Sequence, residues 1–102
     1  MDIQLKKGLL ENCVLAVLNK EDSYGYQVVK DISPHIKISE STLYPILKRL
    51  EGNELLSVYS VEHNGRLRKY YKITDEGKKK LKSFQEEWME VMGVYNFIVS
   101  KI

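Results

Sequence analysis

The chain has 102 residues, 43% hydrophobic and 29% charged, a composition typical of one small globular domain and not of a disordered or membrane protein. Its formal net charge of +2 is too small to indicate a nucleic-acid partner by itself. No apolar run approaches the ~20 residues of a membrane span, no signal-peptide pattern opens the chain, and the single cysteine excludes an internal disulfide, so we expect a cytoplasmic protein.

The charges are segregated along the chain. Residues 64–72 contain four cations and no acid, whereas residues 85–90 contain three acids and no base. This separation predicts a cationic surface distinct from the C-terminal helix.

The first expected helix covers Leu5–Lys20. Between Leu9 and Leu18 it has few polar positions, so we expect it to be covered on more than one side, in part by a partner. Cys13 within it is expected to act as a small buried hydrophobe and not as a redox group.

A second helix is expected over Tyr24–Ile32, capped by Asp22 or Ser23 and ended by Ser33-Pro34. Gly25 at its start indicates a close approach of another backbone or of a phosphate. A short linker then leads to a third helix, which gives the layout of a helix-turn-helix.

The third helix lies within residues 38–56. Ser39 is a suitable N-cap, and Gly52 and Asn53 tolerate the left-handed conformation that a helix end needs. We expect Pro45 to bend this helix without breaking it. An apolar stripe at helical spacing should face inward; it consists of Leu43, Ile46, Leu47 and Leu50. The outward residues are then Ser41, Thr42, Tyr44, Pro45, Lys48 and Arg49.

That outward face has two interpretations. Hydroxyls at the positive end of the helix and cations further along suit a helix laid into a DNA groove. The same residue types also occur on any solvated helix face, so the neighbouring segments must decide.

Two strands, Leu56–Glu62 and Leu67–Ile73, are expected around Asn64-Gly65, a strong signal for a type I′ hairpin. A two-residue loop pairs His63 with Arg66, Val61 with Arg68, Val58 with Tyr71 and Leu56 with Ile73. This register puts Leu56, Val58, Tyr71 and Ile73 on one face, and Arg66, Arg68 and Lys72 on the other. We interpret the hairpin as a wing with a basic tip; the alternative is a solvated hairpin charged for solubility.

The last expected helix begins after Thr74 and runs to Ile102, roughly 40 Å at 1.5 Å per residue. Its apolar residues follow a heptad spacing, and we call them the seam residues: Leu81, Phe84, Trp88, Val91, Tyr95, Ile98 and Ile102. A chain this small can hardly cover such a helix. A second copy of the same chain is the simplest partner, and the helix is also expected to pack on the first helix.

Nothing in the sequence favours catalysis. His35 and His63 lie in a linker and at a hairpin turn, with no ligand-spaced cysteine or carboxylate. A nucleophile elbow and a glycine-rich phosphate loop are both lacking. We therefore expect neither an enzyme nor a bound cofactor or metal.

Together these elements resemble the PadR family of bacterial transcriptional regulators over nearly the full chain. The match is carried by Tyr24-Gly25-Tyr26, by residues 41–51 (STLYPILKRLE), by Gly65-Arg66 and by residues 68–77 (RKYYKITDEG). The shape is similar to the shorter branch of that family, with a single C-terminal dimerisation helix. The expected fold is α+β, mostly α: a winged helix-turn-helix DNA-binding domain (residues 1–74) and a C-terminal dimerisation helix (residues 75–102).

The resemblance implies a homodimeric repressor that binds inverted-repeat operators, often of efflux or stress genes. From the residues, we expect hydroxyls and the Pro45 ring in the major groove, Lys48 and Arg49 on the flanking backbone, and the wing on phosphates or the minor groove. The predicted DNA-binding residues are Tyr24, Tyr26, Ser39, Ser41, Thr42, Tyr44, Pro45, Lys48, Arg49, Arg66, Arg68 and Lys69.

Two further hypotheses remain open. In some relatives an aromatic-lined pore at the dimer interface accepts planar hydrophobic molecules. Trp88 occupies a matching place here, with Met92 near it, and the two are the candidate ligand-binding residues; the alternative is that Trp88 and its neighbours simply fill the interface. A different class of function is a protein-binding winged-helix adaptor that never touches DNA, for which the acidic run and the seam residues would suit a heterotypic coiled coil.

Overall fold

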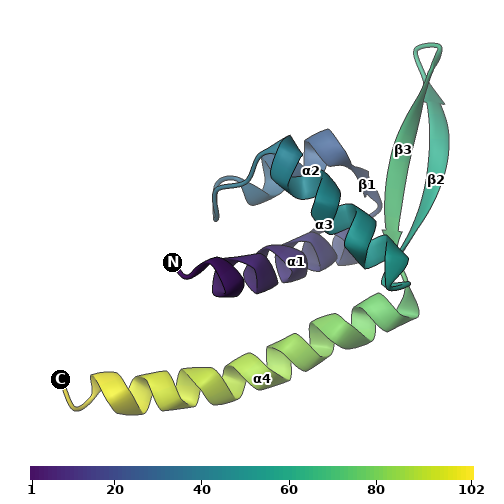
Figure 1. Ribbon diagram of the computed structural model, residues 1–102. Coiled ribbons are helices and arrows are strands. Elements are labelled where there is room, and N and C mark those ends of the chain that lie inside the picture. Colours follow the sequence, from purple (N-terminus) through teal and green to yellow (C-terminus); the bar gives the residue numbers. More distant parts are fainter.

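The computed structural model describes residues 1–102 and contains four helices and a three-stranded sheet (Figure 1). The elements in chain order are α1 (Ile3–Lys20), β1 (Ser23–Tyr24), α2 (Gly25–Ile32), α3 (Glu40–Gly52), β2 (Leu56–His63), β3 (Arg66–Ile73) and α4 (Asp75–Val99). The expected fold class, a mostly helical winged helix-turn-helix with a long last helix, is confirmed.

Helix α1 is the centre of the molecule, because α2 and α3 pack on one side of it and α4 runs along the other (Figure 1). Leu10, Val14, Leu15 and Leu18 are at most 3% exposed. The expectation that this helix is covered on more than one side is confirmed. The helix begins at Ile3, earlier than expected, because the Asp2 carboxylate accepts a hydrogen bond from the Leu5 amide (3.0 Å).

The third strand, β1, was missed by the sequence patterns. Ser23 pairs with Tyr71 and Tyr24 with Tyr70, so β1 lies antiparallel to β3 and the strand order is β1-β3-β2. The expected start of α2 at Tyr24 and its capping by Asp22 or Ser23 are therefore wrong. Tyr24 is the N-cap, without a side-chain capping bond. Two residues cannot show the period-2 alternation by which a strand is recognised.

Helix α3 follows the sequence expectation closely. The Ser39 hydroxyl caps it by accepting from the Thr42 amide (3.3 Å), and the four residues of the predicted apolar stripe are all buried. The helix continues through Pro45, as expected. The helix ends at Gly52 with Asn53 as its C-cap, as expected, but the left-handed residue is Glu54 (φ 62°), not Gly52 or Asn53. This conformation lets the Leu55 amide donate to the Leu50 carbonyl (2.9 Å).

The wing, strands β2 and β3 with their turn, projects beyond the helices (Figure 1). Each of the four predicted cross-strand pairs is confirmed, and each strand is one residue longer than expected. Asn64 and Gly65 have φ of 52° and 78°, the positive values that a type I′ turn requires. Leu56, Tyr71 and Ile73 belong to the buried core, so the predicted apolar face packs on the helices.

Helix α4 begins after Thr74, whose hydroxyl accepts from the Gly77 amide (3.0 Å), and ends at Val99, slightly before the expected Ile102. Gly77 is its only buried residue. Its first half packs on α1, as expected, and its second half continues past the other helices (Figure 1). The chain is consequently elongated, with extents of 60 × 26 × 20 Å.

Candidate nucleic-acid interface

The outer face of α3 presents hydroxyl groups at its N-terminal end. Ser39, Ser41 and Thr42 are exposed, and the Ser39 Oγ lies 3.0 Å from Ser41 Oγ and 3.2 Å from Thr42 Oγ1. Pro45 and Lys48 are also exposed on this helix. Because hydroxyl groups can both donate and accept, the cluster can reorient to hydrogen-bond base edges or phosphates.

Tyr44 lies at the contact between α3 and α2. A Cβ atom added to Gly25 would meet the Tyr44 hydroxyl oxygen at 2.6 Å and Cζ at 2.9 Å, so the phenol ring packs against the start of α2. The close approach predicted at Gly25 is made by a side chain and not by another backbone, while the approach of a phosphate stays a prediction. Tyr44 is still 47% exposed, so the remainder of the ring faces outward.

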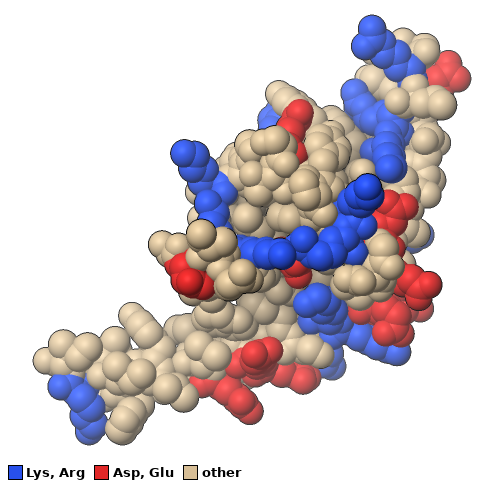
Figure 2. Space-filling model, in the orientation of Figure 1, with Lys and Arg blue, Asp and Glu red and all other residues tan.

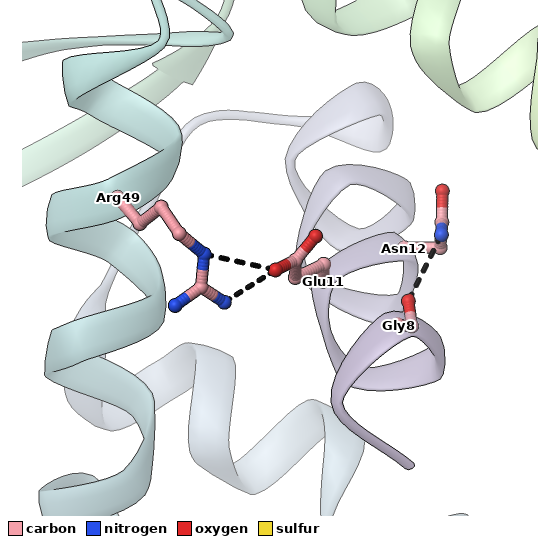
Figure 3. Close-up of polar contacts among 4 residues, drawn as sticks. All are labelled: Gly8, Glu11, Asn12 and Arg49. Carbon is pink, nitrogen blue, oxygen red and sulfur yellow. Dashed lines mark hydrogen bonds and ion pairs between the residues drawn. The ribbon is translucent and has the colours of Figure 1, made fainter. Parts of the chain in front are cut away.

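Arg49 was expected to point outward, but in the structure it binds a residue of α1. Its Nε donates to Glu11 Oε1 at 3.0 Å, and its Nη2 pairs with the same carboxylate oxygen, so the guanidinium connects α3 to α1 (Figure 3). The sequence shows no link between these two residues, which lie 38 positions apart. A role for Arg49 on the DNA backbone stays a prediction.

The three wing cations do not share one face. Strand alternation puts Arg66 and Arg68 on one face and Lys69 on the other. Arg68 lies over the ring of Tyr24, with its guanidinium carbon 4.1 Å from the ring centroid, whereas Lys69 Nζ lies 5.6 Å from the Tyr71 centroid. Arg66 is exposed beside the turn.

Tyr24 and Tyr26, both predicted to hold a phosphate, have different surroundings. Tyr26 is 56% exposed, with Lys30 Nζ 5.5 Å from its ring centroid. Tyr24 is half-buried, and its ring centroid lies 5.4 Å from that of Tyr70 on the neighbouring strand.

Lys and Arg side chains form a band across α3 and continue along the wing, as Figure 2 shows. Acidic side chains gather below this band, near the base of the wing and along α4 (Figure 2). Lys and Arg side chains also lie among the acidic ones near the start of α4, so the charge separation predicted from the sequence is only partial on the folded surface (Figure 2).

The seam residues in the second half of α4 lack a partner within the chain, whereas Leu81 packs on the hydrophobic core. Leu81, Phe84 and Trp88 are half-buried, whereas Val91 is 40%, Tyr95 53% and Ile98 53% exposed. An open groove of about 1000 Å³ along α4 is lined in part by Phe84, Trp88 and Met92. The ring centroids of Phe84 and Trp88 lie 5.8 Å apart.

Cys13 and the side chains that could bind a metal are the remaining candidates for a chemical site. Burial raises the pKa of the Cys13 thiol, which disfavours the reactive thiolate. No three His, Cys, Asp or Glu side chains lie together as a metal site requires. None of the four helices combines the length and the apolar composition that crossing a bilayer requires.

Three contact residues around the predicted interface were missed at the sequence level: Glu11, Asp22 and Tyr59. The Tyr59 hydroxyl donates to Asp22 Oδ2 at 2.7 Å and ties β2 to the turn before β1. The predicted register already placed Tyr59 beside Tyr70, but the place of Asp22 depends on β1, which no pattern revealed.

Comparison with known proteins agrees with this geometry. The chain is 34% identical to an uncharacterized protein of Lysinibacillus sphaericus, over 91% of this chain and 90% of the relative. The crystal structure of a Streptococcus mutans UA159 protein is 47% identical, with a TM-score of 0.82 over 90% of this chain and 87% of the other.

Several relatives of known structure carry a family name, among them the following two. A PadR-like transcriptional regulator of Bacillus cereus is 33% identical, with a TM-score of 0.84 over 94% of this chain and 96% of the other. A PadR family transcription regulator of Clostridium difficile is 32% identical, with a TM-score of 0.82 over 88% and 97%. Residues 14–83 match the model of the transcriptional regulator PadR-like family. This family consists of transcriptional regulators, which confirms the expectation that the protein is not an enzyme. The chain belongs to the PadR-like family of transcriptional regulators.

Proposed function

We propose that this protein is a homodimeric, sequence-specific DNA-binding repressor that recognises an inverted-repeat operator. The observation that carries the proposal is the continuous basic band over α3 and the wing, with exposed hydroxyls at the start of α3 (Figure 2). A family of transcriptional regulators and a winged helix-turn-helix fold both favour duplex DNA as the partner.

In this proposal the exposed start of α3 enters the major groove. Ser41, Thr42 and Tyr44 reach base edges or phosphates, and the Pro45 ring contacts a thymine methyl group. Lys48 and the wing arginines neutralise phosphates on either side, which sets affinity without reading sequence.

We infer the dimer from the seam residues in the second half of α4, which have no partner within the chain. Residues 1–74 then act as the DNA-binding part and residues 75–102 as the dimerisation helix. A two-fold axis through paired α4 helices presents two α3 helices to half-sites one or two helical turns apart. The apolar residues exposed along the second half of α4 support this arrangement.

The test separates affinity from sequence preference. Selection from random duplexes on the full-length protein should enrich an inverted repeat, and the enriched duplex then serves as the probe. Arg66→Ala should weaken binding to all duplexes and lower the slope of log affinity against log salt by about 1.8, the loss of one phosphate contact in each of the two subunits. Tyr44→Ala should additionally reduce the preference for the enriched duplex.

Lys101→Ala is the matched control, since it removes the same charge just beyond the C-terminal end of α4. It should leave both the affinity and the sequence preference unchanged. An intact sequence preference in Tyr44→Ala would mean that α3 does not read the bases. Failure of the wild-type protein to bind any duplex at moderate salt would favour the protein-binding adaptor instead.

A small planar hydrophobic effector is a second part of the proposal, supported by the groove beside Phe84, Trp88 and Met92. Trp88 is the only tryptophan, so its fluorescence reports on this groove alone. Quenching by planar cationic dyes, weakened in a Met92→Glu variant that remains dimeric, would support the binding site. An unquenched tryptophan would mean that these residues only fill the interface.

A further inference from the structure

The three-stranded sheet contains a row of three tyrosine rings, of which only Tyr24 was predicted to contact DNA. Tyr59 and Tyr70 pair across β2 and β3, with ring centroids 5.7 Å apart and planes within 20°. Tyr24 of β1 pairs with Tyr70 from the other side, with a centroid distance of 5.4 Å. The three rings therefore form a row across the sheet, one from each strand.

This row is anchored at one end and carries a cation at the other. At the β2 end, the Tyr59 hydroxyl donates to Asp22 (2.7 Å), whose chain position immediately precedes β1. At the β1 end, the Arg68 guanidinium lies 4.1 Å from the Tyr24 ring centroid. A guanidinium at this distance is held by cation–π attraction and by stacking on the ring face.

The position of Arg68 follows from strand pairing. Arg68 lies two residues before Tyr70 on β3, so the two side chains share a face, and β1 places Tyr24 on the free edge of the same strand. Without β1, a long arginine on a projecting hairpin would be free to sample many rotamers, and ordering it on DNA would cost entropy.

We propose that Tyr24 is a positioning residue for Arg68: its ring holds the guanidinium in place for a DNA phosphate, and its hydroxyl takes no part. This inference rests on the proposed DNA binding and replaces the direct phosphate contact expected of Tyr24 from the sequence. The short strand β1 thereby acquires a function, because it carries the ring to the edge of the wing.

The experiment is a double-substitution cycle on the full-length protein, with a mixed-sequence DNA duplex as the probe and fluorescence anisotropy as the readout. Tyr24→Leu, which removes the ring, should weaken binding about two- to fivefold, whereas Tyr24→Phe should bind as wild type. In an Arg68→Ala background, Tyr24→Leu should have no further effect. In a Lys69→Ala background it should keep its full effect, because Lys69 lies on the opposite face of the same strand.

A second readout needs no DNA. In the free protein, the Arg68 side-chain NMR resonances should be shifted by the ring current of Tyr24, in wild type and in Tyr24→Phe but not in Tyr24→Leu. Equal losses of affinity in Tyr24→Phe and Tyr24→Leu would overturn the inference in favour of a direct hydroxyl contact. An undiminished effect of Tyr24→Leu in the Arg68→Ala background, or unshifted Arg68 resonances, would also overturn it. Absence of duplex binding by the wild-type protein would instead refute the proposed function, while the resonances still report on the ring contact itself.

Discussion

At the residue scale, Gly25 controls where Tyr44 lies. The nearest atoms to an added Cβ belong to the free end of the Tyr44 ring, which can swing away at little cost. Gly25 is also the first residue of α2 and has no positive φ, so alanine suits the backbone there. The consequence of a side chain at this position is therefore a displaced Tyr44 more than a damaged fold.

We predict that Gly25→Ala changes the free energy of unfolding by less than about 1 kcal/mol, because the higher helix propensity of alanine offsets the cost of displacing the Tyr44 ring. The same variant should lose preference for the selected operator. Thermal unfolding and competition binding measure the two effects. Gly52→Ala is the control, since no atom lies within 4 Å of its added Cβ, and it should leave operator preference intact.

Two tyrosines with raised pKa values contribute to the loss of stability at alkaline pH. The hydrogen bond to Asp22, with desolvation and the charge of Asp22, raises the pKa of Tyr59, and burial raises the pKa of Tyr71 above the ordinary tyrosine pKa of 10.0. A raised pKa in the folded state means that the folded protein holds these protons more tightly than the unfolded chain. The stabilisation is complete below pH 10 and is lost as the pH rises through the folded pKa values.

We predict that Asp22→Asn lowers the pKa of Tyr59 toward the ordinary value, because the negative charge that disfavours the phenolate is removed. NMR titration with ring-labelled tyrosine measures this directly. The control is Asp31→Asn. Asp31 accepts a hydrogen bond from Gln27, so this substitution should leave the pKa of Tyr59 unchanged. A Tyr59 pKa that is insensitive to Asp22→Asn would contradict the hydrogen bond as its cause.

At the element scale, the ion pair between Glu11 and Arg49 joins α3 to the central helix. The Glu11 and Arg49 side chains are 17% and 36% exposed, so the pair is partly shielded from water. Glu11→Gln should lower the free energy of unfolding by about 1–2 kcal/mol, since Arg49 would lose its charged acceptor. Chemical denaturation measures the loss.

The control for this pair is Glu76→Gln on α4. Glu76 pairs with Lys79, but the two side chains are 64% and 74% exposed, so the loss should be within about 0.5 kcal/mol. Equal effects of the two substitutions would mean that the pair to Arg49 contributes no more than a solvated one.

The junction between the wing and α4 is another element-scale constraint. A Cβ at Gly77 would lie 2.3 Å from the Leu55 carbonyl oxygen and 2.6 Å from Ile73 Cγ1. The carbonyl cannot move away freely, because it accepts a hydrogen bond from the Thr74 amide (3.1 Å). Close packing of this helix start on the end of the hairpin therefore requires glycine.

Gly77→Ala should accordingly lower the free energy of unfolding by about 2–3 kcal/mol through overpacking. Lys78→Ala, the exposed next residue, should change it by less than about 0.5 kcal/mol. Thermal or denaturant unfolding distinguishes them, and a Gly77→Ala variant as stable as the control would contradict the tight junction.

At the scale of the whole molecule, the second half of α4 has no cover from the rest of the chain. If a second copy covers it, the unfolding midpoint of the wild-type protein should rise with protein concentration. Ile98→Asp should put a charge into the apolar interface, shift sedimentation toward the monomer and lower the unfolding midpoint. Ser83→Asp, an exposed non-seam position of the same helix, should remain dimeric. A wild-type protein that sediments as a monomer at all concentrations would refute the dimer.

The sequence by itself determined what depends on local chemistry and on periodicity. The stripe in α3, the cap at Ser39, the Asn64-Gly65 turn and the register of the wing could all be predicted, because each is specified by neighbouring residues and confirmed by the fold. The seam of α4 was likewise visible, although its role as a dimer interface stays a prediction.

Tertiary structure alone decided the contacts between distant segments. The strand β1 is two residues long and exists only because β3 offers its free edge to Ser23 and Tyr24. The pairing of Arg49 with Glu11, the ring of Tyr44 over Gly25 and the place of Arg68 over Tyr24 depend on how helices and strands pack. No periodicity encodes such contacts, because each joins residues whose separation along the chain carries no signal of their distance in space.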